Sequence, residues 1–201
     1  MTRMRTLTFP IHFTFNISTI ANDFTATDAY GNTVAYVKQK LFKFKDEMVV
    51  YADKNRGDVL FIIRADRWID FSAAYSFTDA GGTELGKVAR KGWASIFKAE
   101  YELIDQHQKL QYHIREENAW IKVLDGLFSE IPVLGILTGY VFNPAYIVSD
   151  LQEQPVVRIK KQPSFWGRRF EITKLREFDQ DDAERIMLGL MMMVLLERRR
   201  G

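Results

Sequence analysis

The chain has 201 residues and a mass of 23.5 kDa, which suits one domain with a sizeable hydrophobic core. Its 28 basic and 26 acidic residues leave a net charge of only +2, so we expect no nucleic-acid partner. The absence of cysteine excludes disulfides, thiolate metal sites and cysteine nucleophiles, and it fits a reducing, cytoplasmic location.

The first predicted element is a strand at residues 8–15. Two arginines precede it, as in a secretory signal, but Pro10, His12 and Asn16 interrupt the stretch and its polarity alternates. A signal peptide needs a continuous apolar run of about 7–15 residues. We therefore expect this segment to open a sheet.

A recurring turn then divides the chain. The intervals between its successive aspartates are 25, 26, 26 and 45 residues, and apolar alternation resumes after each turn. One such period suits two strands and two connections, so the pattern predicts hairpin after hairpin. The aspartates are Asp28, Asp53, Asp79, Asp105 and Asp150.

Counting the strand-like stretches gives about twelve, many of them rich in Val, Ile, Phe, Tyr and Thr. An antiparallel meander of that many strands tends to close, because closure removes exposed edges. The predicted fold is therefore mainly β, a closed antiparallel barrel of about twelve strands. The stretches lie near residues 8–15, 19–28, 33–42, 47–53, 58–65, 71–79, 84–91, 97–105, 109–115, 145–150, 155–161 and 168–175.

The longest interval contains an apolar insert at residues 118–144. Its most apolar part, residues 131–144, is interrupted by Pro132, Gly135 and Gly139. A membrane span needs about 20 apolar residues, so we expect a buried strand or a segment that caps the barrel rather than a transmembrane span.

The C-terminal segment predicts a helix over residues 180–199. Asp181 and Asp182 stand where acidic side chains favour a helix start, and Arg198–Arg200 stand where basic side chains favour a helix end. Residues 186–196 carry no charged or polar side chain. A helix that is apolar on every side is buried on every side, so we expect it to fill the barrel. A membrane tail anchor is the alternative.

Within this helix, Gly189 would allow a strand to approach closely, and four methionines would fill an irregular wall. We therefore expect one barrel domain over residues 1–201. Its strands lie in residues 1–179, with the insert at 118–144, and its central hydrophobic helix lies in residues 180–199.

Four stretches of the chain stand out together: "VKQKLF" (37–42), "DAGGTELGKVARK" (79–91), "VVRIKKQPSF" (156–165) and "LGLMMMVLLERR" (188–199). In this order they resemble the LURP-one-related family of the tubby C-terminal-like superfamily, to which phospholipid scramblases are also related. The resemblance implies a twelve-stranded barrel around a hydrophobic helix. It also implies phosphoinositide headgroup binding, as in tubby-like members, or lipid movement, as in scramblase-like members. No lipid-binding residue is carried over, because none lies in a matching motif.

No catalytic, cofactor-binding or metal site is predicted, so we expect a protein that is not an enzyme and has no cofactor. No two of the three histidines are three or four residues apart, and nucleophile, phosphate-loop and dinucleotide motifs are missing. The acidic pairs Asp46–Glu47 and Glu116–Glu117 are interpreted as solvated turn charges.

Basic residues give the strongest functional hypothesis. Two basic clusters accompany aromatic side chains, with Phe165 and Trp166 inside the second. Such clusters suit an anionic headgroup at a membrane surface, although lysines also blunt strand edges and keep a barrel soluble. The candidate anion- or lipid-binding residues are Lys38, Lys40, Lys43, Lys45, Lys160, Lys161, Arg168 and Arg169.

The sequence thus predicts a non-enzymatic cytoplasmic barrel, peripheral at the membrane, that binds an anionic phospholipid headgroup or a protein partner through its basic turns. Two alternatives are an interaction scaffold without lipid binding and a scramblase-like protein associated with the membrane. Sequence alone leaves open whether Trp93 and Trp166 are buried.

Overall fold

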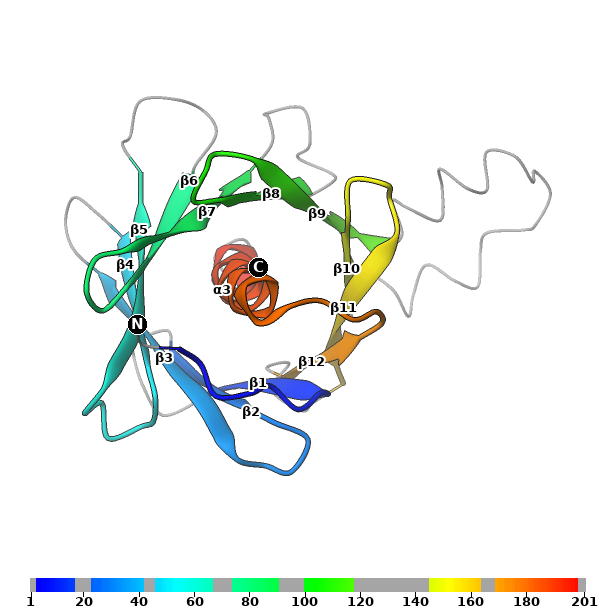
Figure 1. Ribbon diagram of the computed structural model, residues 1–201. Helices are drawn as coiled ribbons and strands as arrows, with labels where there is room; N and C mark the ends of the chain where they lie inside the picture. The colour runs from blue at the N-terminus through cyan, green and yellow to red at the C-terminus, as the bar shows by residue number, and fades with distance from the viewer. Residues whose placement is uncertain are drawn as a thin grey trace.

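Each strand of this protein pairs with the strands before and after it, and the series closes on itself in the computed structural model (Figure 1). The structure describes residues 3–16, 23–41, 46–66, 74–90, 100–117, 145–163 and 169–198. The strands are β1 (Ile11–Phe15), β2 (Asp23–Thr27), β3 (Thr33–Leu41), β4 (Asp46–Tyr51), β5 (Val59–Ala65), β6 (Ala74–Asp79), β7 (Glu84–Arg90), β8 (Glu100–Asp105), β9 (Leu110–Glu116), β10 (Ala145–Ser149), β11 (Pro155–Gln162) and β12 (Arg169–Lys174). A helix, α3 (Gln180–Arg198), follows them.

Closure of the barrel comes from the pairing of its first and last strands. β1 is antiparallel to both β2 and β12, with Phe13 opposite Ala26 on one side and Phe170 on the other. All twelve neighbouring pairs are antiparallel. The predicted closed barrel of about twelve strands is therefore confirmed.

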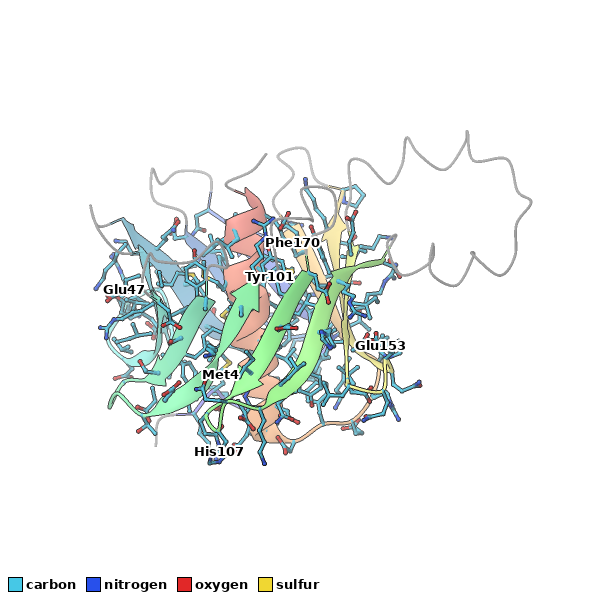
Figure 2. All side chains as sticks on the ribbon, turned by 90° about the horizontal axis from the view of Figure 1, so that it is seen from above. Met4, Glu47, Tyr101, His107, Glu153 and Phe170 are labelled. Carbon is cyan, nitrogen blue, oxygen red and sulfur yellow. The ribbon has the colours of Figure 1, made fainter. Side chains whose placement is uncertain are left out.

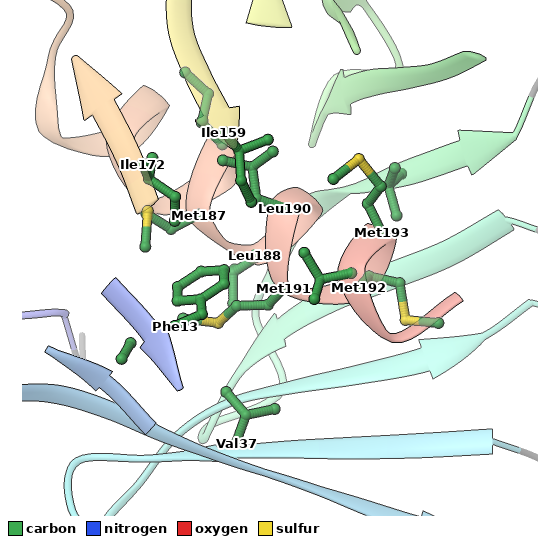
Figure 3. Packing of buried hydrophobic residues seen from close by; sticks show 14 of the residues in the cluster. Phe13, Val37, Ile159, Ile172, Met187, Leu188, Leu190, Met191, Met192 and Met193 are labelled. Carbon is green, nitrogen blue, oxygen red and sulfur yellow. The ribbon is translucent and has the colours of Figure 1, made fainter. Parts of the chain in front are cut away.

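The helix α3 runs through the middle of the barrel, as Figure 1 shows along the barrel axis. Every residue from Ala183 to Leu195 is buried, so the helix has no solvent-facing side over these residues. Figure 3 shows its leucines and methionines among wall residues such as Phe13, Val37 and Ile159. A stripe of apolar residues would be enough for a surface helix, and burial on all sides explains the uninterrupted apolar run. The central helix predicted for residues 180–199 is confirmed at 180–198.

No helix in the described part of the chain has both the length and the apolar character required to cross a bilayer. The insert predicted at residues 118–144 lies outside the described residues.

The repeated aspartate builds the same turn five times. Each aspartate Oδ1 accepts a backbone N–H from two or four residues further along the chain. The residue three positions after each aspartate has φ between 59° and 86°, and these residues are Gly31, Arg56, Gly82, Gln108 and Glu153. Because strands alternate in direction, all five turns lie at one end of the barrel, which we name the aspartate end. Figure 2 shows His107, in one such turn, at this end and Phe170 towards the opposite end.

The N-terminal segment departs from prediction. A strand was expected from residue 8, but β1 begins at Ile11. The residues before it instead reach the start of α3, where the backbone N–H of Met4 donates to Glu184 Oε1 at 2.9 Å and Arg3 pairs with Asp181 at 2.9 Å. Met4 is buried in the core cluster, so this segment covers part of the aspartate end rather than extending the sheet.

Candidate functional site

Two of the predicted basic residues, Lys38 and Lys40, lie near the end of β3. Val37 and Gln39, which alternate with them, are buried, whereas both lysines are partly exposed. Because side chains alternate across a strand, the two lysines share the outer face of the barrel, as the period of two predicted.

Three more of the predicted residues lie where β11 ends and β12 begins. Lys160 and Arg169 are exposed, and Lys161 is partly exposed. Lys161 is opposite Phe170, which is itself opposite the fully buried Phe13, so Lys161 lies on the inner face at the rim. Lys160 precedes Lys161 and Arg169 precedes Phe170, so both lie on the opposite, outer face.

The two groups of basic residues meet at the same end of the barrel, opposite the aspartate end. β3 and β11 both start from aspartate turns, with Lys38 ten residues after Asp28 and Lys160 ten residues after Asp150. Three strands, β2, β1 and β12, separate β3 from β11 (Figure 1). At about 4.8 Å per strand, the groups are on the order of 19 Å apart along the wall. We name Lys38, Lys40, Lys160, Lys161 and Arg169 the basic arc.

Among the described residues, ion pairs are scarce along the basic arc. Lys40 Nζ lies 3.6 Å from Glu47 Oε1. The other four members have no carboxylate at ion-pair distance among the residues that the structure describes. Asp23, opposite Lys38 in register, instead accepts hydrogen bonds from the Tyr36 hydroxyl and, at 2.9 Å, the Asn16 side-chain amide. Glu171 lies opposite Lys160 in register, so Lys38, Lys40 and Lys160 each have an acidic neighbour on an adjacent strand, although only Lys40 forms an ion pair among the described residues.

Arginines elsewhere on the outer wall are paired instead. Three ion pairs connect neighbouring or nearby strands: Arg64–Glu47 at 2.9 Å, Arg115–Glu100 at 3.0 Å and Arg158–Glu117 at 2.8 Å. The interpretation of Glu47 and Glu117 as solvated turn charges was wrong, because their side chains are only 18% and 20% exposed and bind arginines. Their partners lie on other strands, so sequence adjacency could not reveal them.

The remaining candidates, Lys43, Lys45 and Arg168, lie outside the described residues, as do Trp93 and Trp166. The part of the predicted site that the structure places is therefore the basic arc itself.

A polar cluster that the sequence analysis missed lies inside the barrel near the end of α3. The Tyr101 hydroxyl donates to Glu197 Oε1 at 2.7 Å, and Tyr146 also donates to Glu197. Burial, followed by the charge of Glu197, raises the pKa of both phenols, so they stay neutral hydrogen-bond donors. The available signal in the sequence was Tyr101, a residue with a hydroxyl group on the same face of β8 as the apolar Leu103. This cluster attaches the helix to the wall.

The described residues contain no group of three histidine, aspartate or glutamate side chains able to hold a metal ion. Of the histidines, His113 lies with its Nδ1 3.7 Å from Glu100 Oε1 on the outer wall. The chemistry that the described part of the site offers is therefore that of cations, with the Lys161 ammonium at the rim and the others on the outer face.

Comparison with known proteins supports one relationship. The family model described as LURP-one-related matches residues 33–173, which is more than half of the chain and extends from the start of β3 into β12. Neither the curated proteins nor the solved structures gave a match.

Proposed function

Because this chain belongs to the LURP-one-related family, we propose that it is a non-enzymatic barrel protein that binds an anionic phospholipid headgroup through the basic arc. The observation that carries the proposal is the convergence of Lys38 with Lys160, Lys161 and Arg169. Lys38 is more than 120 positions from the other three in sequence, yet all four reach the same end of the barrel, and none forms an ion pair with another described residue.

The closed topology weakens the main alternative explanation of these lysines. Lysines on edge strands prevent one sheet from pairing with another. Here β3 pairs with both β2 and β4, and β11 pairs with both β10 and β12, so neither is an edge. A cluster of cations on fully paired strands supports binding of an anion.

The electrostatic free energy expected for the basic arc predicts reversible, salt-sensitive association with a membrane. Each basic residue near an anionic bilayer contributes about 1 kcal/mol, so four unpaired members give on the order of 4 kcal/mol. That is the affinity of a peripheral protein that leaves the membrane when salt screens its charges. We accordingly propose a cytoplasmic protein that binds reversibly to the membrane surface.

Vesicle co-sedimentation tests the proposal. The full chain should bind vesicles containing phosphatidylserine or phosphoinositides, should not bind phosphatidylcholine vesicles, and should dissociate as salt rises. The double variant Lys160→Gln/Arg169→Gln should bind about thirtyfold less tightly, since it loses two charges of about 1 kcal/mol each.

The matched control is Lys54→Gln/Lys109→Gln, which removes two exposed lysines from turns at the aspartate end. It should bind vesicles as the unchanged protein does. Equal loss in both double variants would mean that only net charge matters, and no loss in either would exclude the basic arc. Association that persists in high salt and needs detergent to reverse would favour the scramblase-like alternative.

A further inference from the structure

A second feature lies at the aspartate end, away from the basic arc. A pocket of about 430 Å³ opens there between the N-terminal segment, the start of β3 and the turns that follow β4 and β6. Its lining includes the buried side chains of Val34 and Leu60, which are 4% and 7% exposed. Small-molecule sites commonly enclose about 300–1,000 Å³ and combine apolar walls with a few polar groups.

The charged side chains of this pocket have opposite signs and do not pair with each other. Arg5 and Asp58 both line it, yet no ion pair joins them, and neither has another charged partner within the described residues. Their charged groups are therefore farther apart than ion-pair distance, and the same pocket has apolar lining residues. The third charged residue, Arg3, is already paired with Asp181 at 2.9 Å.

The segment that carries Arg5 is anchored just before it, at Arg3 and Met4. Arg3 is held by its ion pair, and the Met4 N–H donates to Glu184 Oε1 on α3. Val34 and Leu60 belong to the hydrophobic core. The pocket is thus largely preformed, which reduces the entropy lost when a ligand binds.

We propose that this pocket binds a zwitterionic molecule about the size of a dipeptide, with its carboxylate on Arg5 and its ammonium on Asp58. A simple anion would satisfy Arg5 but would face the carboxylate of Asp58, and a simple cation would have the reverse problem. A ligand with both charges and an apolar body between them satisfies both side chains and covers Val34 and Leu60.

Three matched probes separate the two charges: glycyl-leucine, its N-acetyl derivative, which keeps only the carboxylate, and its C-terminal amide, which keeps only the ammonium. Titrations followed by ¹H–¹⁵N NMR should show saturable shifts at Val34, Gly57 and Leu60 with glycyl-leucine. The two single-charge probes should bind at least about tenfold more weakly.

Two variants assign each charge to its residue. Arg5→Gln should reduce binding of glycyl-leucine and of the N-acetyl probe about tenfold and leave the amide unchanged. Asp58→Asn should reduce binding of glycyl-leucine and of the amide and leave the N-acetyl probe unchanged. Both residues are exposed, so both variants should remain folded.

Arg176→Gln is the matched control, because it removes an exposed arginine near the start of α3 that does not line the pocket. It should leave the affinity for all three probes unchanged. Absence of saturable binding of glycyl-leucine at concentrations on the order of 10 mM would overturn the proposal. Equal binding of the three probes, or glycyl-leucine binding that survives both Arg5→Gln and Asp58→Asn, would overturn it as well.

Discussion

Gly189 of α3 packs so closely against Leu103 of β8 that a Cβ atom on the glycine would lie 2.3 Å from Leu103 Cδ2. Gly189 lies in the helix that the barrel encloses, and Leu103 is fully buried on the inner face of the wall. A glycine in the interior of a helix costs up to about 1 kcal/mol relative to alanine, so its presence here needs a compensating contact. Close approach of the helix backbone to Leu103 supplies that contact, as the sequence analysis expected for Gly189.

Gly189→Ala should therefore destabilise the protein despite the better helix propensity of alanine. Overpacking a core costs about 1–3 kcal/mol, against a propensity gain of about 1 kcal/mol, so we expect a net loss on the order of 1 kcal/mol in urea unfolding. In a Leu103→Ala background the obstacle is gone, and the same change should become stabilising.

Gly57→Ala is the control, because a Cβ at Gly57 meets no atom within 4 Å. It should be neutral or slightly stabilising. The proposed packing would be wrong if Gly189→Ala had the same sign with leucine and with alanine at position 103.

Leu190→Asp should prevent the barrel from folding. Leu190 is fully buried in the hydrophobic cluster, and an unpaired carboxylate there has no partner to offset its desolvation. Near-ultraviolet circular dichroism and the cooperative thermal transition should both be lost. Thr173→Asp, which adds the same charge at an exposed position on β12, should keep both. A folded Leu190→Asp variant would show that the barrel stands without its central helix.

Asp79→Asn should change how stability depends on pH. The Thr83 N–H donates to Asp79 Oδ1 at 2.8 Å, and this bond, opposed by burial, holds the pKa of the Asp79 carboxyl below its usual 3.8. A carboxyl with a lowered folded pKa stabilises the protein above pH 3.8, and this stabilisation disappears as pH falls through the folded value.

The free-energy difference between the unchanged protein and Asp79→Asn should therefore shrink as acid unfolding experiments move below pH 3.8. Glu177→Gln removes an equal charge outside the turns, and it should not reproduce that shrinkage. A constant difference across the acid range would contradict the role given to the turn hydrogen bond.

Tyr101→Phe should weaken the attachment of α3 near its C-terminal end. Its hydroxyl donates to the carboxylate of Glu197 at 2.7 Å, and hydrogen bonds to charged groups contribute about 1.5–3 kcal/mol. We expect a loss at the lower limit, because Tyr146 also donates to Glu197. Tyr30→Phe is the control, since Tyr30 is 80% exposed and should show no change in unfolding free energy.

The hairpins could be predicted from sequence because their signals are local. Each turn aspartate binds backbone groups only two or four residues away, and Asp105 binds both, so the repeat is complete within a short window. The helix could be predicted for a similar reason, since its uninterrupted apolar run is a local feature, although the same run also allowed a membrane tail anchor.

Contacts between distant segments could not be predicted in the same way. The Met4–Glu184 hydrogen bond spans 180 residues, and the Arg158–Glu117 bond spans 41. The positions of these residues depend on how the barrel closes, which no local pattern specifies. For the same reason, the sequence alone could not show that Lys38 and Lys160 lie at the same end of the barrel. Both basic clusters could be identified in the sequence, but their relative position could not.

The order of the elements along the chain has a consequence for synthesis. β1 can be paired on both sides only after β12 has been made, and α3 follows every strand. All twelve strands are therefore synthesised before the helix that they enclose. Until α3 emerges, the inward faces of the nascent strands are not covered by the helix, and a chain stalled before α3 should require a chaperone or aggregate.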